Sequence, residues 1–131
     1  MAKINEEMRE VLEGSMWVLA TADKNGVPNA VPIHFTKVLG ENQLMLVDNF
    51  MKKTKVNIEA NPHVSISVWK KSVGFQFKGI AKIETSGAHF DAGVEMVKKA
   101  TDKFVPKGVV VVDLDDIYIT TSGKQAGEKV E

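Results

Sequence analysis

The stretch from Pro28 to Pro62, PNAVPIHFTKVLGENQLMLVDNFMKKTKVNIEANP, decides the fold predicted for this chain. Its pattern predicts a strand, a turn, a second strand and a short basic helix that stops at Asn61-Pro62. The helix is expected to open with residues 49–54, NFMKKT. Two ammonium groups, one hydroxyl and the unpaired N–H groups of a helix start would then lie together. This arrangement predicts an anion site, most naturally for a phosphate.

The ends of the two preceding strands are expected to complete this site. The first strand ends in residues 34–37, HFTK, and the second in Val47-Asp48. A run of lysines is usually a solvated helix face, so the lysines alone are a weak signal, which the neighbouring strand ends strengthen. His34 is the one side chain we would test as an acid or base, although a strand histidine is more often a surface or hydrogen-bonded residue. The catalytic residues stay unknown.

Size and composition indicate one globular domain over residues 1–131. Hydrophobic residues make up 44% and charged residues 26% of the chain, and the formal net charge is +0. A chain of this length can bury a single core. A neutral chain has no bulk attraction to nucleic acid or to anionic lipid, so neither is an expected partner. We expect no membrane span and no signal peptide.

The residue types exclude several kinds of chemistry. The chain has no cysteine, which excludes disulfides and thiolate metal sites and fits a cytoplasmic protein. Its three histidines show no metal-ligand spacing, so we expect no metal site. It also has no phosphate-binding glycine loop and no nucleophile elbow. A bound cofactor would therefore supply the reactive atoms of any redox chemistry.

Hydrophobic periodicity and turn residues predict the remaining elements. Helices are expected over residues 5–13 and 86–100, and strands over 16–22, 28–37, 43–48, 63–70, 75–85 and 109–121, the last as one strand or two. Hairpin turns between so many strands imply a closed antiparallel β-architecture. The polar tail, residues 122–131, is expected to fray.

The strand around Pro32 is expected at an edge or a break, because proline donates no ladder hydrogen bond. Alternation places Val31, Ile33 and Phe35 on one face, where they can fill a barrel. The opposite face has no obvious helix to cover it. A ligand on that face would stay largely in water unless a second subunit closed over it, which predicts a homodimer.

The pattern from Met16 to about Thr121 resembles the FMN-binding split-barrel proteins related to pyridoxamine 5′-phosphate oxidase. The matching features, in order, are Ala20-Thr21, Asn25-Gly26-x-Pro28, Pro32-Ile33-His34-Phe35, Val47-Asp48-Asn49, Lys53-Thr54, Asn57-Ile58-x-x-Asn61-Pro62 and Gly79. The resemblance implies a mainly β fold, a six-stranded antiparallel split β-barrel with flanking helices.

The resemblance also implies FMN as the cofactor, held at the interface of a homodimer. The residues it places at the FMN are Pro32, Ile33, His34, Phe35, Thr36 and Lys37 along the ring, Val47, Asp48 and Asn49 beside it, Lys52, Lys53 and Thr54 at the phosphate, and Gln76 and Lys78 on a later strand. Family enzymes often have arginine where this chain has Lys53 and Thr54, and lysine offers a point charge instead of a bidentate fork.

On this basis we expect an FMN-binding flavoprotein, either a flavin-dependent oxidoreductase or an electron carrier, with a small-molecule electron donor or acceptor. Pyridoxamine 5′-phosphate oxidase itself engages substrate through a C-terminal segment with Trp and Arg, which this tail lacks, so we do not expect that activity. The alternatives are a non-enzymatic binder of haem or of the deazaflavin F420 on the same fold, and, less favoured, a barrel that binds single-stranded nucleic acid.

Overall fold

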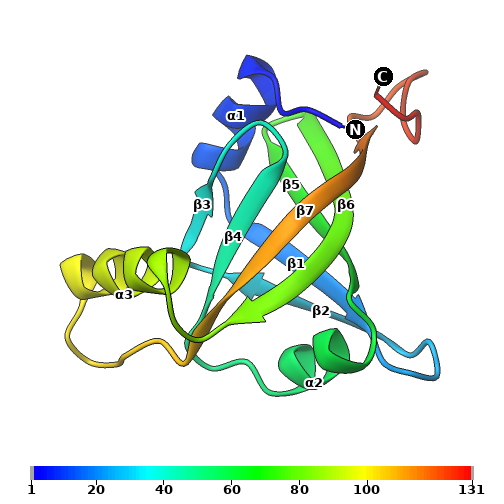
Figure 1. The fold of residues 1–131 in the computed structure, drawn as a ribbon. Helices are drawn as coiled ribbons and strands as arrows, with labels where there is room; N and C mark the ends of the chain where they lie inside the picture. Colours follow the sequence, from blue (N-terminus) through cyan, green and yellow to red (C-terminus); the bar gives the residue numbers. More distant parts are fainter. Residues whose placement is uncertain (1, 131) are drawn as a thin grey trace.

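The computed structural model describes residues 2–130, so Met1 and Glu131 lie outside the described residues. The elements along the chain are α1 (Glu6–Glu13), β1 (Trp17–Ala22), β2 (Pro28–Ile33), β3 (Thr36–Val38), β4 (Gln43–Asp48), α2 (Lys53–Ala60), β5 (His63–Lys70), β6 (Val73–Glu84), α3 (Ala88–Ala100) and β7 (Gly108–Ile119). They form a curled sheet with flanking helices (Figure 1). The predicted mainly β split barrel is confirmed, but it has seven strands where six were expected.

The extra strand arises because the strand expected over residues 28–37 is broken. The sheet order is β2-β1-β5-β6-β7-β4-β3, so β2 and β3 are opposite edges although they follow each other in sequence. The break is at His34 and Phe35. Before it, Ile33 pairs with Trp17 of β1, and after it Thr36 pairs with Leu46 of β4. The chain thus crosses from one edge of the curled sheet to the other, which is what leaves the barrel split.

The break also changes which residues share a face. Ile33 is buried in the main core inside the barrel, with Trp17, Leu19 and Phe77. Phe35, expected on the same face, packs against a separate cluster that contains Met45. The expectation that Phe35 fills the barrel is therefore wrong, because the chain changes direction between Ile33 and Phe35.

Each helix occupies a different side of the barrel. In Figure 1, α1 lies at one end of the barrel, α2 at the opposite end, and α3 beside β4. The α1 helix is capped by Asn5, whose Oδ1 accepts a 2.9 Å hydrogen bond from the amide of Met8. The α3 helix begins at Ala88, two positions after the expected start at Ser86, and Gly87 is its N-cap residue. Its C-terminal end reaches the same side of the barrel as the break between β2 and β3.

A bulge bends the hairpin of β6 and β7. Lys78 pairs with Asp116 and Gly79 pairs with Leu114, so Asp115 is one extra residue on β7. A β-carbon on Gly79 would lie 2.1 Å from the carbonyl oxygen of Asp113. The close approach requires glycine here. The bulge keeps β7 continuous, so the segment expected as one strand or two is one strand.

The tail after β7 differs from the expected frayed end. It turns back along β7, where the amide of Val130 donates to the carbonyl of Ile117 over 2.8 Å and Lys129 bridges Tyr118. Because β4 pairs only as far as Asp113, the rest of that β7 edge is open to the returning tail. No helix within residues 2–130 is long and apolar enough to cross a membrane.

Candidate functional site

One pocket of about 780 Å³ gathers most of the residues predicted from the sequence. It lies between the start of α2, the break after β2 and the loop after α3. Of the predicted residues, the pocket is lined by Pro32, Ile33, His34, Phe35, Val47, Asn49, Lys52, Lys53 and Thr54. It is also lined by residues that were not predicted, namely Asn29, Val31, Phe50, Met51, Ala100, Thr101 and Phe104.

The polar end of the pocket is the start of α2. Lys52 and Lys53 are exposed there, and neither has an acidic partner among residues 2–130. The first turn of α2 contains no acidic residue, and no side chain caps its free N–H groups. The partial positive charge of the helix start is therefore reinforced by two ammonium groups and balanced by no described residue. This end of the pocket can bind an anion.

Four polar side chains, the half-buried Asn29 and the buried Thr21, Thr54 and Asn57, fasten this helix start to the sheet. Asn29 Nδ2 lies 3.1 Å from Thr54 Oγ1 and 3.3 Å from Thr21 Oγ1. Asn57 Nδ2, one turn further along α2, lies 2.9 Å from the same Thr21 oxygen. Sequence reasoning missed Asn29. The signal was present in the strand alternation, which places Asn29 on the inward face with Val31 and Ile33, where a polar residue needs partners.

A second part of the pocket lining is aromatic. The ring centroids of Phe50 and Phe104 are 5.1 Å apart, and those of Phe35 and Phe104 are 6.3 Å apart, both in edge contacts. Phe50 is 71% exposed, which is unusual for a phenylalanine held in place by a neighbouring ring. Phe104 comes from the loop after α3, and no sequence signal placed that loop beside β2. This part of the lining can hold a planar apolar group.

Asp48 does not line the pocket, although it was predicted to contact the cofactor. Its side chain is buried, and its Oδ1 accepts a 2.9 Å hydrogen bond from the amide of Met51. The carboxylate thus holds the turn that leads into α2. A direct contact between Asp48 and a cofactor stays a prediction.

Four other predicted residues also lie outside the pocket. Thr36 and Lys37 belong to β3 and pair with Leu46 and Met45, because the break carries them to the far edge of the sheet. Gln76 and Lys78 lie on β6, and neither lines the pocket. The ammonium group of Lys78 instead lies 5.3 Å from the centroid of the Tyr118 ring. Within a single chain, therefore, none of the four reaches the pocket.

One buried polar atom in the pocket wall has no partner. Oδ1 of Asn49 is the only buried side-chain nitrogen or oxygen within residues 2–130 that lacks a hydrogen bond. Such an atom is unfavourable unless a ligand or water supplies a donor. The part of the chain that the structure describes holds no cluster of three His, Asp or Glu side chains placed to bind a metal ion.

Comparisons with known proteins agree with this architecture. Residues 4–121 match the family model described as pyridoxamine 5′-phosphate oxidase. The uncharacterized protein MJ0282 of Methanocaldococcus jannaschii is 35% identical over 133 residues, covering 99% of this chain and 89% of its own. HupZ of Group A Streptococcus has a similar structure, with a TM-score of 0.85 and 28% identity over 95% of this chain and 99% of its own. An FMN-binding protein from Syntrophomonas wolfei shares the fold, with a TM-score of 0.78 and 18% identity over 88% of this chain and 85% of its own.

The fold is that of a split-barrel protein. The chain belongs to the pyridoxamine 5′-phosphate oxidase family, since the family model spans nearly all of it.

Proposed function

We propose that the pocket binds FMN and that the protein is a flavin-dependent oxidoreductase or electron carrier acting on a small molecule. The observation that carries this proposal is the continuity of the pocket. A single cavity is lined both by the cationic start of α2 and by the aromatic side chains of Phe35, Phe50 and Phe104. FMN combines the two kinds of group that such a lining can hold, since it has a phosphate at one end and a planar ring system at the other.

The residues present fit this ligand. Lys52, Lys53 and Thr54 would hold the phosphate, together with the free N–H groups of the helix start. The partnerless Oδ1 of Asn49 would accept a hydrogen bond from a ring N–H or a ribityl hydroxyl. When bound, FMN supplies the ability to accept and donate electrons. His34 is exposed at the pocket wall and is the histidine that lines this pocket.

The proposal does not extend to oxidation of vitamin B6. Residues 122–131 contain neither tryptophan nor arginine, the two residue types with which pyridoxamine 5′-phosphate oxidase engages its substrate at its C-terminus. In this structure the tail is also paired with β7 as far as Val130. We therefore propose a small-molecule substrate other than vitamin B6.

We also propose that two copies assemble over the outer face of β2, β1, β5 and β6. Pro32, Val18, Ser67 and Gln76 are paired in sequence across these four strands, so they form one row on that face. Neighbouring strands are about 4.8 Å apart, which places Gln76 roughly 14 Å from Pro32. This separation favours a second copy as the source of a Gln76 that contacts a flavin at Pro32.

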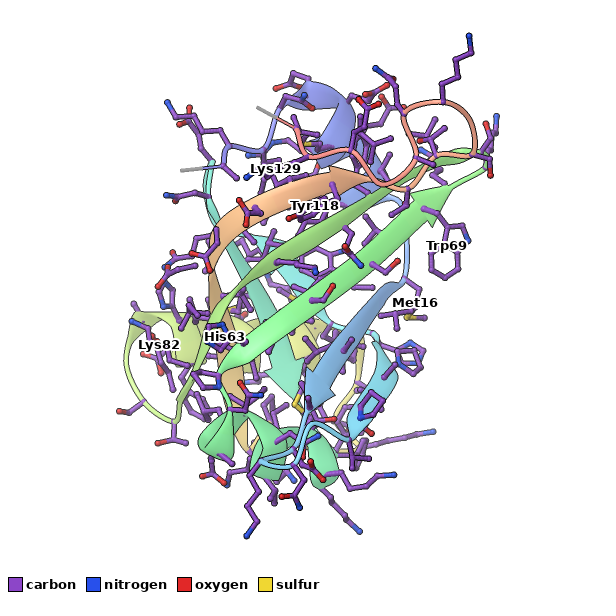
Figure 2. All side chains as sticks on the ribbon, turned by 90° about the vertical axis from the view of Figure 1, so that its right-hand side faces the viewer. Met16, His63, Trp69, Lys82, Tyr118 and Lys129 are labelled. Carbon is purple, nitrogen blue, oxygen red and sulfur yellow. The ribbon has the colours of Figure 1, made fainter. Side chains whose placement is uncertain are left out.

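Exposed apolar side chains border the same outer face. Met16 is 42% exposed and Trp69 is 56% exposed, and Figure 2 shows both projecting from the same side of the molecule. No described helix covers this face, since α1 and α2 occupy the two ends of the barrel and α3 lies beside β4 (Figure 1). A second copy would bury these side chains and close the pocket beside Pro32.

Absorption spectra of the purified protein after equilibration with each ligand test the cofactor. With FMN in excess and then removed, we expect one retained flavin per chain with a shifted visible band. After equilibration with haem and removal of the excess, the protein should show no Soret band. After the same treatment with F420, it should retain no deazaflavin. If the protein retained haem or F420 in preference to FMN, that ligand would be assigned to the pocket in place of FMN.

A further inference from the structure

The hydrogen-bond network beneath the pocket gives the Thr54 hydroxyl a fixed direction. We propose that Asn29 is a positioning residue that makes this hydroxyl an obligate donor, so that the site selects a phosphate monoester over an uncharged group. This inference rests on the proposed function, because it concerns the phosphate end of the same pocket. It adds a specificity role for a residue that does not touch the reacting ring.

The distances indicate that the amide of Asn29 is the donor. Its Nδ2 lies 3.1 Å from Thr54 Oγ1 and 3.3 Å from Thr21 Oγ1, distances closer to an N–H···O bond than to the shorter O–H···O bond. One NH₂ group carries two protons and can serve both oxygens. Asn57 donates to Thr21 as well. Both hydroxyl oxygens therefore act as acceptors within the network.

The proton of Thr54 is left without an acceptor among residues 2–130. A threonine hydroxyl has one proton to donate, and its oxygen here already accepts from Asn29. Thr54 is only 3% exposed, yet it lines the pocket at the start of α2. A buried donor without an acceptor is unfavourable, so this hydroxyl needs an acceptor in the pocket, which a ligand or a water can supply.

An ionised phosphate meets this requirement best. Its oxygens only accept hydrogen bonds once the group is fully ionised, and a charge-assisted bond is roughly twice as strong as a neutral one. The terminal hydroxyl of riboflavin offers a weaker neutral acceptor in the same place. The network can also serve simply to anchor α2 on β1 and β2, in which case its loss would affect both ligands alike.

A double-mutant cycle separates the two roles. Dissociation constants for FMN and riboflavin are measured for wild type, Asn29→Ala, Thr54→Val and the double variant, with thermal unfolding as a check on the fold. Thr54→Val removes the hydroxyl at constant shape. If Asn29→Ala does not fold, the uncharged and near-isosteric Asn29→Leu takes its place, because a charged residue at this pocket-lining position would repel a phosphate whatever the role of Asn29.

We expect Thr54→Val to weaken FMN about 10- to 100-fold and riboflavin no more than a few-fold. Asn29→Ala should weaken FMN selectively, and it should have no further effect on FMN once Thr54 is valine. Equal losses for the two ligands, or additive losses in the double variant, would overturn the positioning role while leaving FMN binding intact. A wild-type protein that binds neither flavin would overturn the proposed function and this inference together.

Discussion

Lys107 holds Asp48 and the turn that follows it from outside the pocket. Its ammonium group lies 3.7 Å from Asp48 Oδ1 and donates a 2.8 Å hydrogen bond to the carbonyl of Met51, while its amide donates to the carbonyl of Asp48. Asp48 in turn accepts from the amide of Met51. The turn between β4 and α2, which carries Asn49 and Phe50 into the pocket wall, is therefore fixed on both sides.

Replacing Lys107 by methionine should loosen this turn. We expect the free energy of unfolding to fall by about 1–2 kcal/mol, because a hydrogen bond to Met51 and the partner of a buried carboxylate are lost together. FMN and riboflavin should weaken by the same factor, since the change alters the pocket wall and spares the phosphate contacts. Denaturant titration and flavin fluorescence measure the two quantities.

The matched control is Lys82→Met. Lys82 pairs with Glu84 at the surface, where an ion pair contributes at most about 1 kcal/mol. Lys107→Arg should recover most of the lost stability. If Lys107→Met were as stable as Lys82→Met and bound flavin normally, the turn would not depend on this clamp.

Gly79 should tolerate no side chain. A β-carbon there would lie 2.1 Å from the Asp113 carbonyl, and that backbone belongs to the bulged strand β7 and cannot move aside. We expect Gly79→Ala to lower the unfolding free energy by about 1–3 kcal/mol. Gly40→Ala is the control, because a β-carbon on Gly40 meets nothing within 4 Å. Equal stability of the two variants by denaturant titration would argue against the close approach.

His34 should modulate the flavin without holding it. Its side chain is exposed at the pocket wall and has no hydrogen bond to another described residue. We expect His34→Ala to shift the midpoint potential of the flavin or to change the rate of flavin reoxidation by a few-fold. The affinity for FMN should stay within about threefold of the wild-type value. His63→Ala, at an exposed position outside the pocket, should change neither. Loss of flavin from folded His34→Ala protein would show that this side chain is needed for binding.

The sequence predicted the strands well where alternation is regular. The boundaries of β5 match the expected residues, and its alternate side chains Val64, Ile66 and Val68 all face the core. It failed at His34 and Phe35, because alternation continues through a break that only the curvature of the whole sheet requires. Phe104 and Asn29 were missed for different reasons. Phe104 enters the pocket from a loop with no periodic signal. Asn29 lies on the inward face of β2, where a polar residue needs hydrogen-bond partners, and this signal was overlooked.

The two-copy assembly makes a prediction for solution. Light scattering at micromolar concentration should give the mass of a dimer, and FMN should strengthen the association because a ligand touching both copies stabilises the assembly. Ser67→Glu places a charge in the middle of the outer face and should yield a monomer with weaker FMN binding. Ser72→Glu, in the exposed turn between β5 and β6, adds the same charge elsewhere and should stay dimeric. A wild-type monomer with tight FMN binding would contradict the shared site.

The central claim, that the start of α2 holds the phosphate of FMN, is tested most directly by calorimetric titration of Lys53→Ala with FMN and with riboflavin. Lys53 lines the pocket and has no acidic partner within residues 2–130. Losing a charge-assisted contact should weaken FMN about 10- to 100-fold. Riboflavin, which has no phosphate, should change little. Lys55→Ala, on the same helix but outside this pocket, should weaken FMN far less. Equal losses of FMN and riboflavin in Lys53→Ala would contradict the phosphate site.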